Sequence, residues 1–406
     1  MPRFFVSGPL GFEQKLIEEL QSVWFLLADL DGLPTRAGFP EMTVIEGGVE
    51  FDTELHLGLQ LNFFSKQAYR VLLRVAHFPA RFYDQLEKQL AQINWAGYLK
   101  PESSVGFKVS FAKSRLNNEK NLIEACQNVF KKKGFNFSEE PEQTLFIRIT
   151  RDHAEISIDS SGEHLHRRGY RLQQGEAPIR ENLAALLWSF MPEMAGPNDL
   201  IFDPFCGSGT LLFEYLLKAQ PNFSRPYAFL SWPNCPAIMK SATFNKNFRW
   251  IDTSDVAPQL LGSDMSADVL KKAQANWELV QKHYGLKSRL HWLESRCAQV
   301  KLDGAIVQQP GGTLFVVANP PYGERLDDRG AMEDLNIFLK QNGSGFQQVH
   351  VLVLQPLGRV PEFENVSLKD KIPFSNQGLK LNLLHYLKKR NIKIESHMDK
   401  KIEIGS

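Results

Sequence analysis

From residue 200 onward, short apolar runs alternate with helical segments about a dozen residues long, and this alternation constrains the fold more than any other feature. Runs such as Leu200–Asp203, Gln259–Asp264 and Thr313–Asn319 are apolar on both faces, as strands covered by helices on both sides must be. The series predicts an α/β fold with a doubly wound, mostly parallel sheet. A predicted hairpin at Phe374–Leu381 adds an antiparallel edge.

The first 160 residues show shorter, alternating strands and amphipathic helices, which predict a separate α+β region. Helices are expected at Phe12–Leu27, from Asn62 onward, and at Phe82–Leu90 and Glu119–Lys132. Strands are expected at Arg3–Val6, Met42–Ile45, Gly48–Phe51, Tyr69–Val75, Ser104–Phe111, Gln143–Thr150 and Ala154–Ser160. Beyond residue 200, further strands are expected at Arg289–Leu293 and Val349–Leu354, helices at Thr210–Ala219 and Ala267–Val280, and an irregular insertion at Pro221–Pro258.

The distribution of charge is uneven, although the net charge of the whole chain is only +1. Residues 1–60 hold 3 Lys and Arg against 10 Asp and Glu, whereas residues 61–135 hold 13 against 5. A basic block of this size is typical of a surface that binds nucleic acid, because its cations displace the counterions condensed on phosphates. A solvated face balanced by the preceding acidic segment is an equal alternative.

Composition excludes several classes of protein. With 43% hydrophobic and 23% charged residues, the 406-residue chain is neither disordered nor collagen-like. No apolar run approaches the ~18 residues of a membrane span, and the N-terminus lacks the apolar core of a signal peptide. The four cysteines lie far apart, which argues against a disulfide framework and a structural zinc site. We therefore expect a cytoplasmic protein with no metal and no membrane partner.

A glycine-rich turn, Asp203-Pro204-Phe205-Cys206-Gly207-Ser208-Gly209-Thr210, follows the first of these buried strands and precedes a helix. Its glycines allow the backbone to approach a ligand closely, and the helix N-terminus offers unpaired N–H groups to a carboxylate. The carboxylate of Asp203 suits a ligand that carries an ammonium group. A tight connection without a ligand is the alternative.

Two further polar groups follow neighbouring strands. Asp264, next to Met265, ends the second strand and can accept the hydroxyl groups of a ribose, or else cap the following helix. Asn319-Pro320-Pro321-Tyr322 follows a later strand. Because proline lacks an N–H, the Asn319 amide oxygen and the Pro320 carbonyl can both accept from one amine beside the flat Tyr322 ring. This suits the exocyclic amine of a planar base, although such dipeptides also mark ordinary turns.

Together these motifs resemble the class I S-adenosylmethionine-dependent methyltransferases, in which Asn-Pro-Pro-Tyr is typical of enzymes that methylate amino groups. The closer resemblance is to the bacterial THUMP-domain guanine-N2 methyltransferases of large-subunit ribosomal RNA. Matching stretches cover nearly the whole chain: Gly11–Glu13, Gly47–Phe51, Ile93–Trp95, Asp159–Arg171, Glu176–Ala184, Asp203–Thr210 and Asn319–Leu326. Some members carry a second methyltransferase domain after the first, which we expect this chain to lack.

The resemblance implies a Rossmann-like methyltransferase domain with an antiparallel C-terminal hairpin, preceded by an α+β region that binds RNA. The implied division is a ferredoxin-like segment at 1–60, a THUMP domain at 61–160, a junction at 161–198, the methyltransferase domain at 199–393 and a tail at 394–406. The implied reaction transfers a methyl group from S-adenosyl-L-methionine to the N2 amine of a guanosine in 23S ribosomal RNA. A tRNA guanine-N2 methyltransferase, a DNA adenine-N6 methyltransferase and a catalytically silent RNA-binding protein are the alternatives.

The resemblance also assigns roles to residues. The implied catalytic residues are Asn319, Pro320, Pro321 and Tyr322. The implied cofactor-binding residues are Asp203, Pro204, Phe205, Gly207, Gly209, Thr210, Asp264, Met265, Arg180 and Glu181. The implied RNA-binding residues are Lys113, Arg115, Lys131, Lys132, Lys133, Arg167, Arg168 and Arg171. The three arginines could instead pair with carboxylates at a domain junction, and the three consecutive lysines could simply close a helix.

One position departs from the family pattern. Where the family has an acid after the third strand that contacts the adenine amine, this chain has Arg296. Either Glu294, two residues earlier, or backbone groups would then have to recognise adenine.

Overall fold

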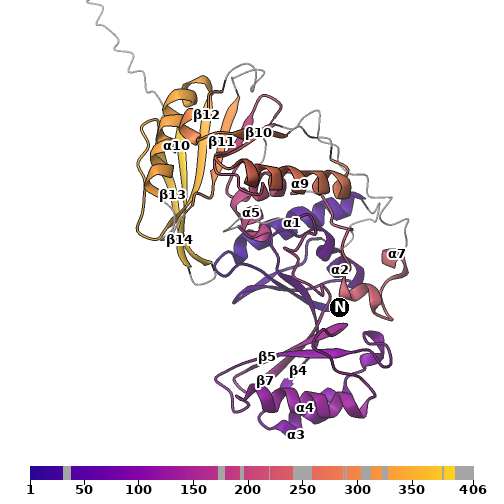
Figure 1. The fold of residues 1–406 in the computed structure, drawn as a ribbon. Helices are drawn as coiled ribbons and strands as arrows, with labels where there is room; N and C mark the ends of the chain where they lie inside the picture. The colour runs from indigo at the N-terminus through magenta and orange to yellow at the C-terminus, as the bar shows by residue number, and fades with distance from the viewer. Residues whose placement is uncertain are drawn as a thin grey trace, which may run out of the picture.

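The structure, a computed structural model, describes residues 1–30, 38–171, 179–192, 196–218, 220–240, 258–286, 288, 290–302, 312–321, 328–376 and 379–388. Two seven-stranded sheets form its framework (Figure 1). The first is built from strands before residue 160 and the second from strands after residue 199. The strand and helix pattern predicted from residue 200 onward differs from that of the first 160 residues, and this difference corresponds to the change from one sheet to the other.

The N-terminal sheet is mixed and has the strand order β2-β3-β1-β4-β7-β6-β5. All neighbours in it are antiparallel except β5 and β6, which are parallel. Its strands are β1 (Arg3–Ser7), β2 (Thr43–Ile45), β3 (Gly48–Asp52), β4 (Arg70–Pro79), β5 (Val105–Ala112), β6 (Gln143–Thr150) and β7 (His153–Asp159). Its helices are α1 (Glu13–Leu30), α2 (Leu55–Phe64), α3 (Tyr83–Gln92) and α4 (Glu119–Lys132).

Alternating burial explains how this sheet packs. Along β6 every second residue is buried, and Leu145, Ile147 and Ile149 belong to the same apolar core as residues of α3 and α4. Alternation of this kind is expected of a strand with one face on the core and one toward water. Figure 1 shows α3 and α4 on the side of β4, β5 and β7 that points away from the sheet formed after residue 199.

The sheet runs without a break across the boundary expected at residue 60, because β1 pairs along its whole length with β4. The helix predicted from Asn62 onward is wrong, since α2 begins at Leu55 and ends at Phe64. Seven of its ten residues are buried, including Gln60 and Asn62, so the helix has no polar stripe for a periodicity argument to detect.

The C-terminal sheet has the order β10-β9-β8-β11-β12-β14-β13. The first five strands are parallel, and the hairpin of β13 and β14 adds an antiparallel edge, which confirms both predictions. Its strands are β8 (Leu200–Asp203), β9 (Gln259–Asp264), β10 (Leu290–Glu294), β11 (Thr313–Ala318), β12 (Gln348–Pro356), β13 (Val366–Asn376) and β14 (Leu379–Lys388). Its helices are α5 (Glu181–Trp188), α6 (Thr210–Leu216), α9 (Ala267–Tyr284) and α10 (Asp328–Asn342).

Strand burial accounts for the parallel sheet. All four residues of β8 and five of the six in β11 are buried, so helices must cover both faces. One core cluster joins the sheet to residues of α6 and α9, and another joins it to residues of α10. The predicted helix at Thr210–Ala219 is shorter than expected, because α6 ends at Leu216.

The first part of the insertion, residues 221–240, contains the short helix α7 (Ala237–Lys240) and packs on the N-terminal domain. The Trp232 indole is buried and donates to Gln143 at the start of β6, at 2.9 Å. Within the described ranges, no helix combines the length and apolarity that crossing a bilayer requires.

Candidate functional site

The glycine-rich turn joins β8 to α6 at the carboxyl edge of the parallel sheet. Gly207 and Gly209 have positive φ angles of 52° and 88°, which glycine adopts without the penalty of a Cβ. A Cβ on Gly209 would lie 2.5 Å from the Phe213 ring, whereas a Cβ on Gly207 would meet no atom within 4 Å. The turn therefore leaves open space beside Gly207.

Backbone hydrogen bonds tie the turn to the neighbouring strand β9. The Gly207 N–H donates to Asp264 Oδ2 at 3.1 Å, and the Cys206 N–H donates to the Ser263 carbonyl at 2.9 Å. Asp203 Oδ1 accepts from the Phe205 N–H at 3.1 Å. The carboxylates of Asp203 and Asp264 therefore both accept hydrogen bonds from the backbone of the turn and help to fix its conformation.

Asp203 is buried at the end of β8 without a cationic partner among the described residues. Burial raises the pKa of its carboxyl to about 8, and the negative charge of Asp264 adds to this shift. A carboxyl group held in this state gains from an incoming cation, which favours its ionised form. The site thus fits the ammonium group that the sequence suggests.

Asp264 is not the cap of helix α9. Ser266 holds that position, and its hydroxyl accepts from the Val269 N–H at 3.4 Å. Asp264 Oδ1 instead accepts from the Ser266 N–H at 3.0 Å, while Oδ2 holds Gly207. The capping alternative is wrong, and Asp264 lies at the carboxyl end of β9. Met265 beside it is 72% exposed.

Asn319 follows β11 directly, and its side-chain oxygen gives the strongest indication that a ligand binds at this site. Oδ1 is buried and has no hydrogen-bond partner within the described part of the chain. Leaving such an acceptor unpaired costs about 1–3 kcal/mol, so a ligand donor at this position would be favourable. Pro320 is buried and Pro321 half-buried, while Tyr322 lies outside the described residues.

The strand order brings these groups to one place. β8 lies between β9 and β11 and is parallel to both, so Asp203, Asp264 and Asn319 all follow the carboxyl ends of adjacent strands. This edge is where open α/β sheets bind their ligands.

Arg296, at the position that departs from the family pattern, makes an ion pair. Its Nε lies 2.6 Å from Oδ2 of the buried Asp334, on helix α10. The arginine therefore links the end of β10 to α10, and Glu294 is exposed at the carboxyl end of β10.

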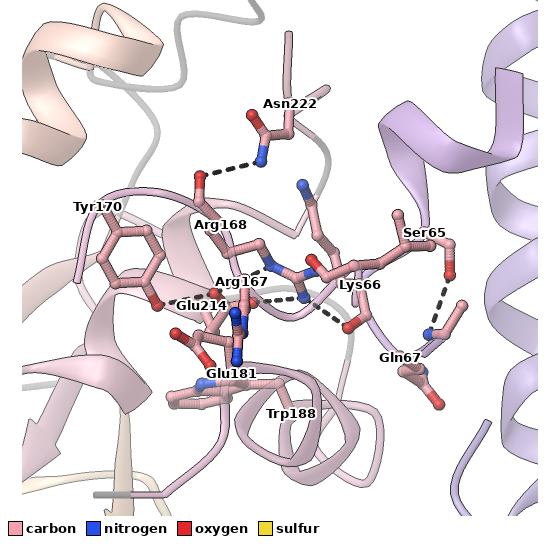
Figure 2. Close-up of polar contacts among 12 residues, drawn as sticks. Ser65, Lys66, Gln67, Arg167, Arg168, Tyr170, Glu181, Trp188, Glu214 and Asn222 are labelled. Atoms are coloured by element: carbon pink, nitrogen blue, oxygen red, sulfur yellow. Dashed lines mark hydrogen bonds and ion pairs between the residues drawn. The ribbon is translucent and has the colours of Figure 1, made fainter. Parts of the chain in front are cut away.

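Arg167, Arg168 and Arg171, in the junction segment, differ in how far their side chains are exposed. Arg168 is buried, with Nη2 3.2 Å from Glu214 Oε2 on α6, and it also donates to the Lys66 carbonyl (Figure 2). The Tyr170 hydroxyl donates to the other oxygen of Glu214 at 2.8 Å. The expectation that Arg168 contacts RNA is wrong, because its guanidinium is enclosed by protein and joins the N-terminal domain to α6.

Arg171 is likewise enclosed, which corrects its expected role in RNA binding. It pairs with Glu181 at 3.2 Å and donates to the Ile179 carbonyl at 2.6 Å and to Thr210 Oγ1 at 3.4 Å. Arg171 therefore connects Glu181 to Thr210, at the end of the glycine-rich turn. Arg180 directly precedes α5. Direct contact of Arg180 or Glu181 with a cofactor stays a prediction.

The other predicted RNA-binding residues are exposed. Arg167 extends into solvent, and Lys113, Arg115 and Lys131–Lys133 lie on the surface of the N-terminal domain. The Arg115 guanidinium stacks 5.6 Å from the centre of the half-exposed Phe82 ring. Sequence reasoning missed Phe82, because the fold and not the sequence brings Arg115 to its ring.

Comparison with known proteins agrees with this geometry. Residues 168–353 match the model of the UPF0020 family, described as an RMKL-like methyltransferase domain. The ribosomal RNA large subunit methyltransferase K/L of Syntrophotalea carbinolica is 29% identical over 85% of this chain and 48% of its own length. A putative RNA methyltransferase of Synechocystis is 28% identical, covering 87% of this chain and 91% of the relative.

The fold is also found in solved structures. SMU.472, a putative methyltransferase complexed with SAH, superposes with a TM-score of 0.72 at 22% identity, over 96% of this chain and 98% of its own. This chain spans about half the length of the K/L relatives that it matches. Over residues 168–353, this chain is similar to the RMKL-like methyltransferase domains.

Proposed function

We propose that this protein transfers the methyl group of S-adenosylmethionine to the exocyclic N2 amine of a guanosine in large-subunit ribosomal RNA. The observation that carries the proposal is the buried, unpartnered Oδ1 of Asn319 at the edge of the sheet that Asp203 and Asp264 border. The K/L relatives, named for large-subunit ribosomal RNA, support the choice of substrate.

The residues present fit the cofactor, which supplies a methyl group activated on a sulfonium. Asp203 would pair with its ammonium group, since burial holds the carboxyl in a state that an adjacent cation relieves. Asp264 would accept from the ribose hydroxyls, and the open space beside Gly207 would admit the amino-acid part. Thr210 begins α6, whose unpaired N–H groups favour a carboxylate.

The chain's own contribution to the reaction is positioning. An exocyclic amine is a weak nucleophile because its lone pair is delocalised into the ring. By accepting from the amine, Asn319 Oδ1 and the Pro320 carbonyl favour the geometry in which that lone pair is available. The nitrogen becomes acidic only once the methyl group is attached, so its proton can leave to solvent and no strong base is needed.

An amide acceptor serves adenine N6 as well as guanine N2, so the kind of nucleic acid decides between the candidates. The cations at Lys113, Arg115 and Lys131–Lys133 favour a large polyanion over a free nucleotide. The relatives favour ribosomal RNA over tRNA or DNA.

The test is methyl transfer from labelled S-adenosylmethionine to three substrates: large-subunit RNA from cells that lack the gene, total tRNA, and duplex DNA. Digestion and mass analysis of the nucleosides should show N2-methylguanosine in the ribosomal RNA alone. N6-methyladenine in the DNA, or N2-methylguanosine in the tRNA alone, would establish the corresponding alternative. A protein that binds S-adenosylmethionine and RNA but transfers no methyl group would be the silent alternative.

A further inference from the structure

Two histidines and a tyrosine form an aromatic cluster beside the N-terminal sheet. The rings of His164 and His166 stack with their centroids 5.2 Å apart and 28° between their planes. The Tyr69 ring meets both edge-on, at 6.3 Å and 6.5 Å. All three residues are partly buried, with some surface exposed. The cluster thus offers aromatic surface to the solvent.

The surroundings of the two histidines are cationic. Burial, together with neighbouring cations that include Arg167 and Arg180, lowers the pKa of His164 to about 4 and that of His166 to about 3. Both rings are therefore neutral near pH 7. The Arg167 side chain is 65% exposed, and its ion-pair partner among the described residues is the exposed Glu163, a pair of little strength that a phosphate can displace.

The backbone that carries the rings is firmly held. The Leu165 N–H donates to the Tyr69 carbonyl at 2.8 Å. Arg225 donates to the carbonyl of His164 at 2.7 Å and to that of Glu163 at 2.9 Å. A ring pair fixed in this way has little conformational entropy left to lose when a ligand stacks on it.

The ring nitrogens argue against a purely structural role. Nδ1 of His164 and Nδ1 of His166 are both buried with no hydrogen-bond partner among the described residues. Histidines kept only for packing usually have their buried nitrogens paired. These rings are held by stacking and by their backbone, which suits a platform for another flat ring.

A short segment of the chain joins the cluster to a residue that contacts the end of the glycine-rich turn. His166 precedes Arg171 by five residues, so their Cα atoms are at most ~18 Å apart. Arg171 in turn donates to Thr210 Oγ1, at the start of α6. Arg171 therefore links the segment that carries the two histidines to the start of α6.

We propose that Tyr69, His164 and His166 form a stacking platform for an unpaired nucleobase of the RNA strand that carries the target guanosine. Arg167 contacts a neighbouring phosphate of the same strand. The inference rests on the proposed function, because it takes single-stranded RNA as the ligand.

The experiment measures binding of a short single-stranded RNA to the full chain by fluorescence anisotropy. Replacing both histidines, His164→Ala with His166→Ala, should weaken binding by about 5-fold to 150-fold, the loss expected for one base–aromatic stack. Replacing His166→Phe keeps a flat ring and should preserve most of the affinity. His153→Ala is the matched control, because it removes one ring of the stacked pair His77–His153 and should leave the affinity unchanged.

A second measurement does not depend on the folding of variants. RNA that contains a photoreactive uridine should crosslink to the wild-type peptide that contains Tyr69 or to peptides within residues 161–171. Crosslinks confined to any other peptides would overturn the platform.

The binding experiment distinguishes an error in the platform proposal from an error in the proposed function. If the wild-type chain binds RNA and the double variant binds it equally well, the platform is wrong and the methyltransferase proposal stands. If the wild-type chain binds S-adenosylmethionine but no RNA, both are wrong. Calorimetry with S-adenosylmethionine shows that each variant is folded.

Discussion

Replacing Asn319 with alanine separates the catalytic role of this side chain from a structural one. Its Oδ1 is buried without a partner in the described structure, so the folded protein already bears the cost of an unsatisfied acceptor, about 1–3 kcal/mol. Asn319→Ala removes that cost together with some packing. We therefore expect an unfolding midpoint that is unchanged or raised, and unchanged affinity for S-adenosylmethionine.

Turnover should behave in the opposite way. Removing one well-placed electrostatic contact to the reacting group typically costs a factor of about 10²–10³ in kcat, or about 2.7–4 kcal/mol. The assay is single-turnover methyl transfer to RNA at saturating cofactor, with thermal unfolding and calorimetry on the same preparation. A variant that keeps more than about a tenth of the wild-type rate has lost less than about 1.4 kcal/mol, and this would refute the proposed role. A large loss of stability would show that the amide is structural.

Other predictions follow from the carboxylates and the basic residues. Asp264→Ala should weaken S-adenosylmethionine binding in calorimetry, because the ribose loses its acceptor and Gly207 loses a hydrogen bond; equal affinity would mean that Asp264 only shapes the turn. The pKa of Asp203 is about 8 in the folded chain against 3.8 ordinarily, so its contribution to stability is complete below pH ~4 and is lost as pH rises through 8. Asp203→Asn should remove this fall in urea titrations, and an unaltered pH profile would contradict the shift. Arg168→Met should destabilise the protein by about 3–5 kcal/mol, because it leaves a buried carboxylate unpaired; a loss below about 1 kcal/mol in urea unfolding would show that water reaches this carboxylate. Lys113→Ala with Arg115→Ala should weaken RNA binding and make its salt dependence shallower by about 0.7–0.9 for each phosphate that the variant no longer neutralises; an identical slope would place the RNA elsewhere.

The second half of the fold was predictable because its central strands β8, β11 and β12 are buried on both faces. The run Leu314–Ala318 of β11 has no polar position to confuse its assignment, and helix α9 is bounded by the clear signals Ser266 and Gly285. Helix α2 was misplaced for the opposite reason, since protein surrounds almost all of it and its sequence carries no periodicity. The parallel pairing of β5 with β6 depends on contacts that no local pattern encodes.

The site was predictable in part. The order of the strands was enough to bring Asp203, Asp264 and Asn319 together, because parallel strands end at one edge. The sequence could not distinguish the adjacent arginines Arg167 and Arg168. Arg167 faces solvent, whereas Arg168 is buried and pairs with Glu214, which lies 46 residues later in the chain on α6. The aromatic cluster was missed because Tyr69 joins the two histidines only through the tertiary fold.

The central claim is that this protein methylates guanosine N2 in large-subunit ribosomal RNA, and one measurement tests it most directly. Nucleoside and fragment mass analysis of ribosomal RNA compares cells with the gene, without it, and complemented with either the wild-type gene or Asn319→Ala. We predict that one N2-methylguanosine of the large-subunit RNA is absent without the gene, restored by the wild type, and not restored by Asn319→Ala. Unchanged large-subunit RNA in the deletion strain, or full restoration by the variant, would contradict the account.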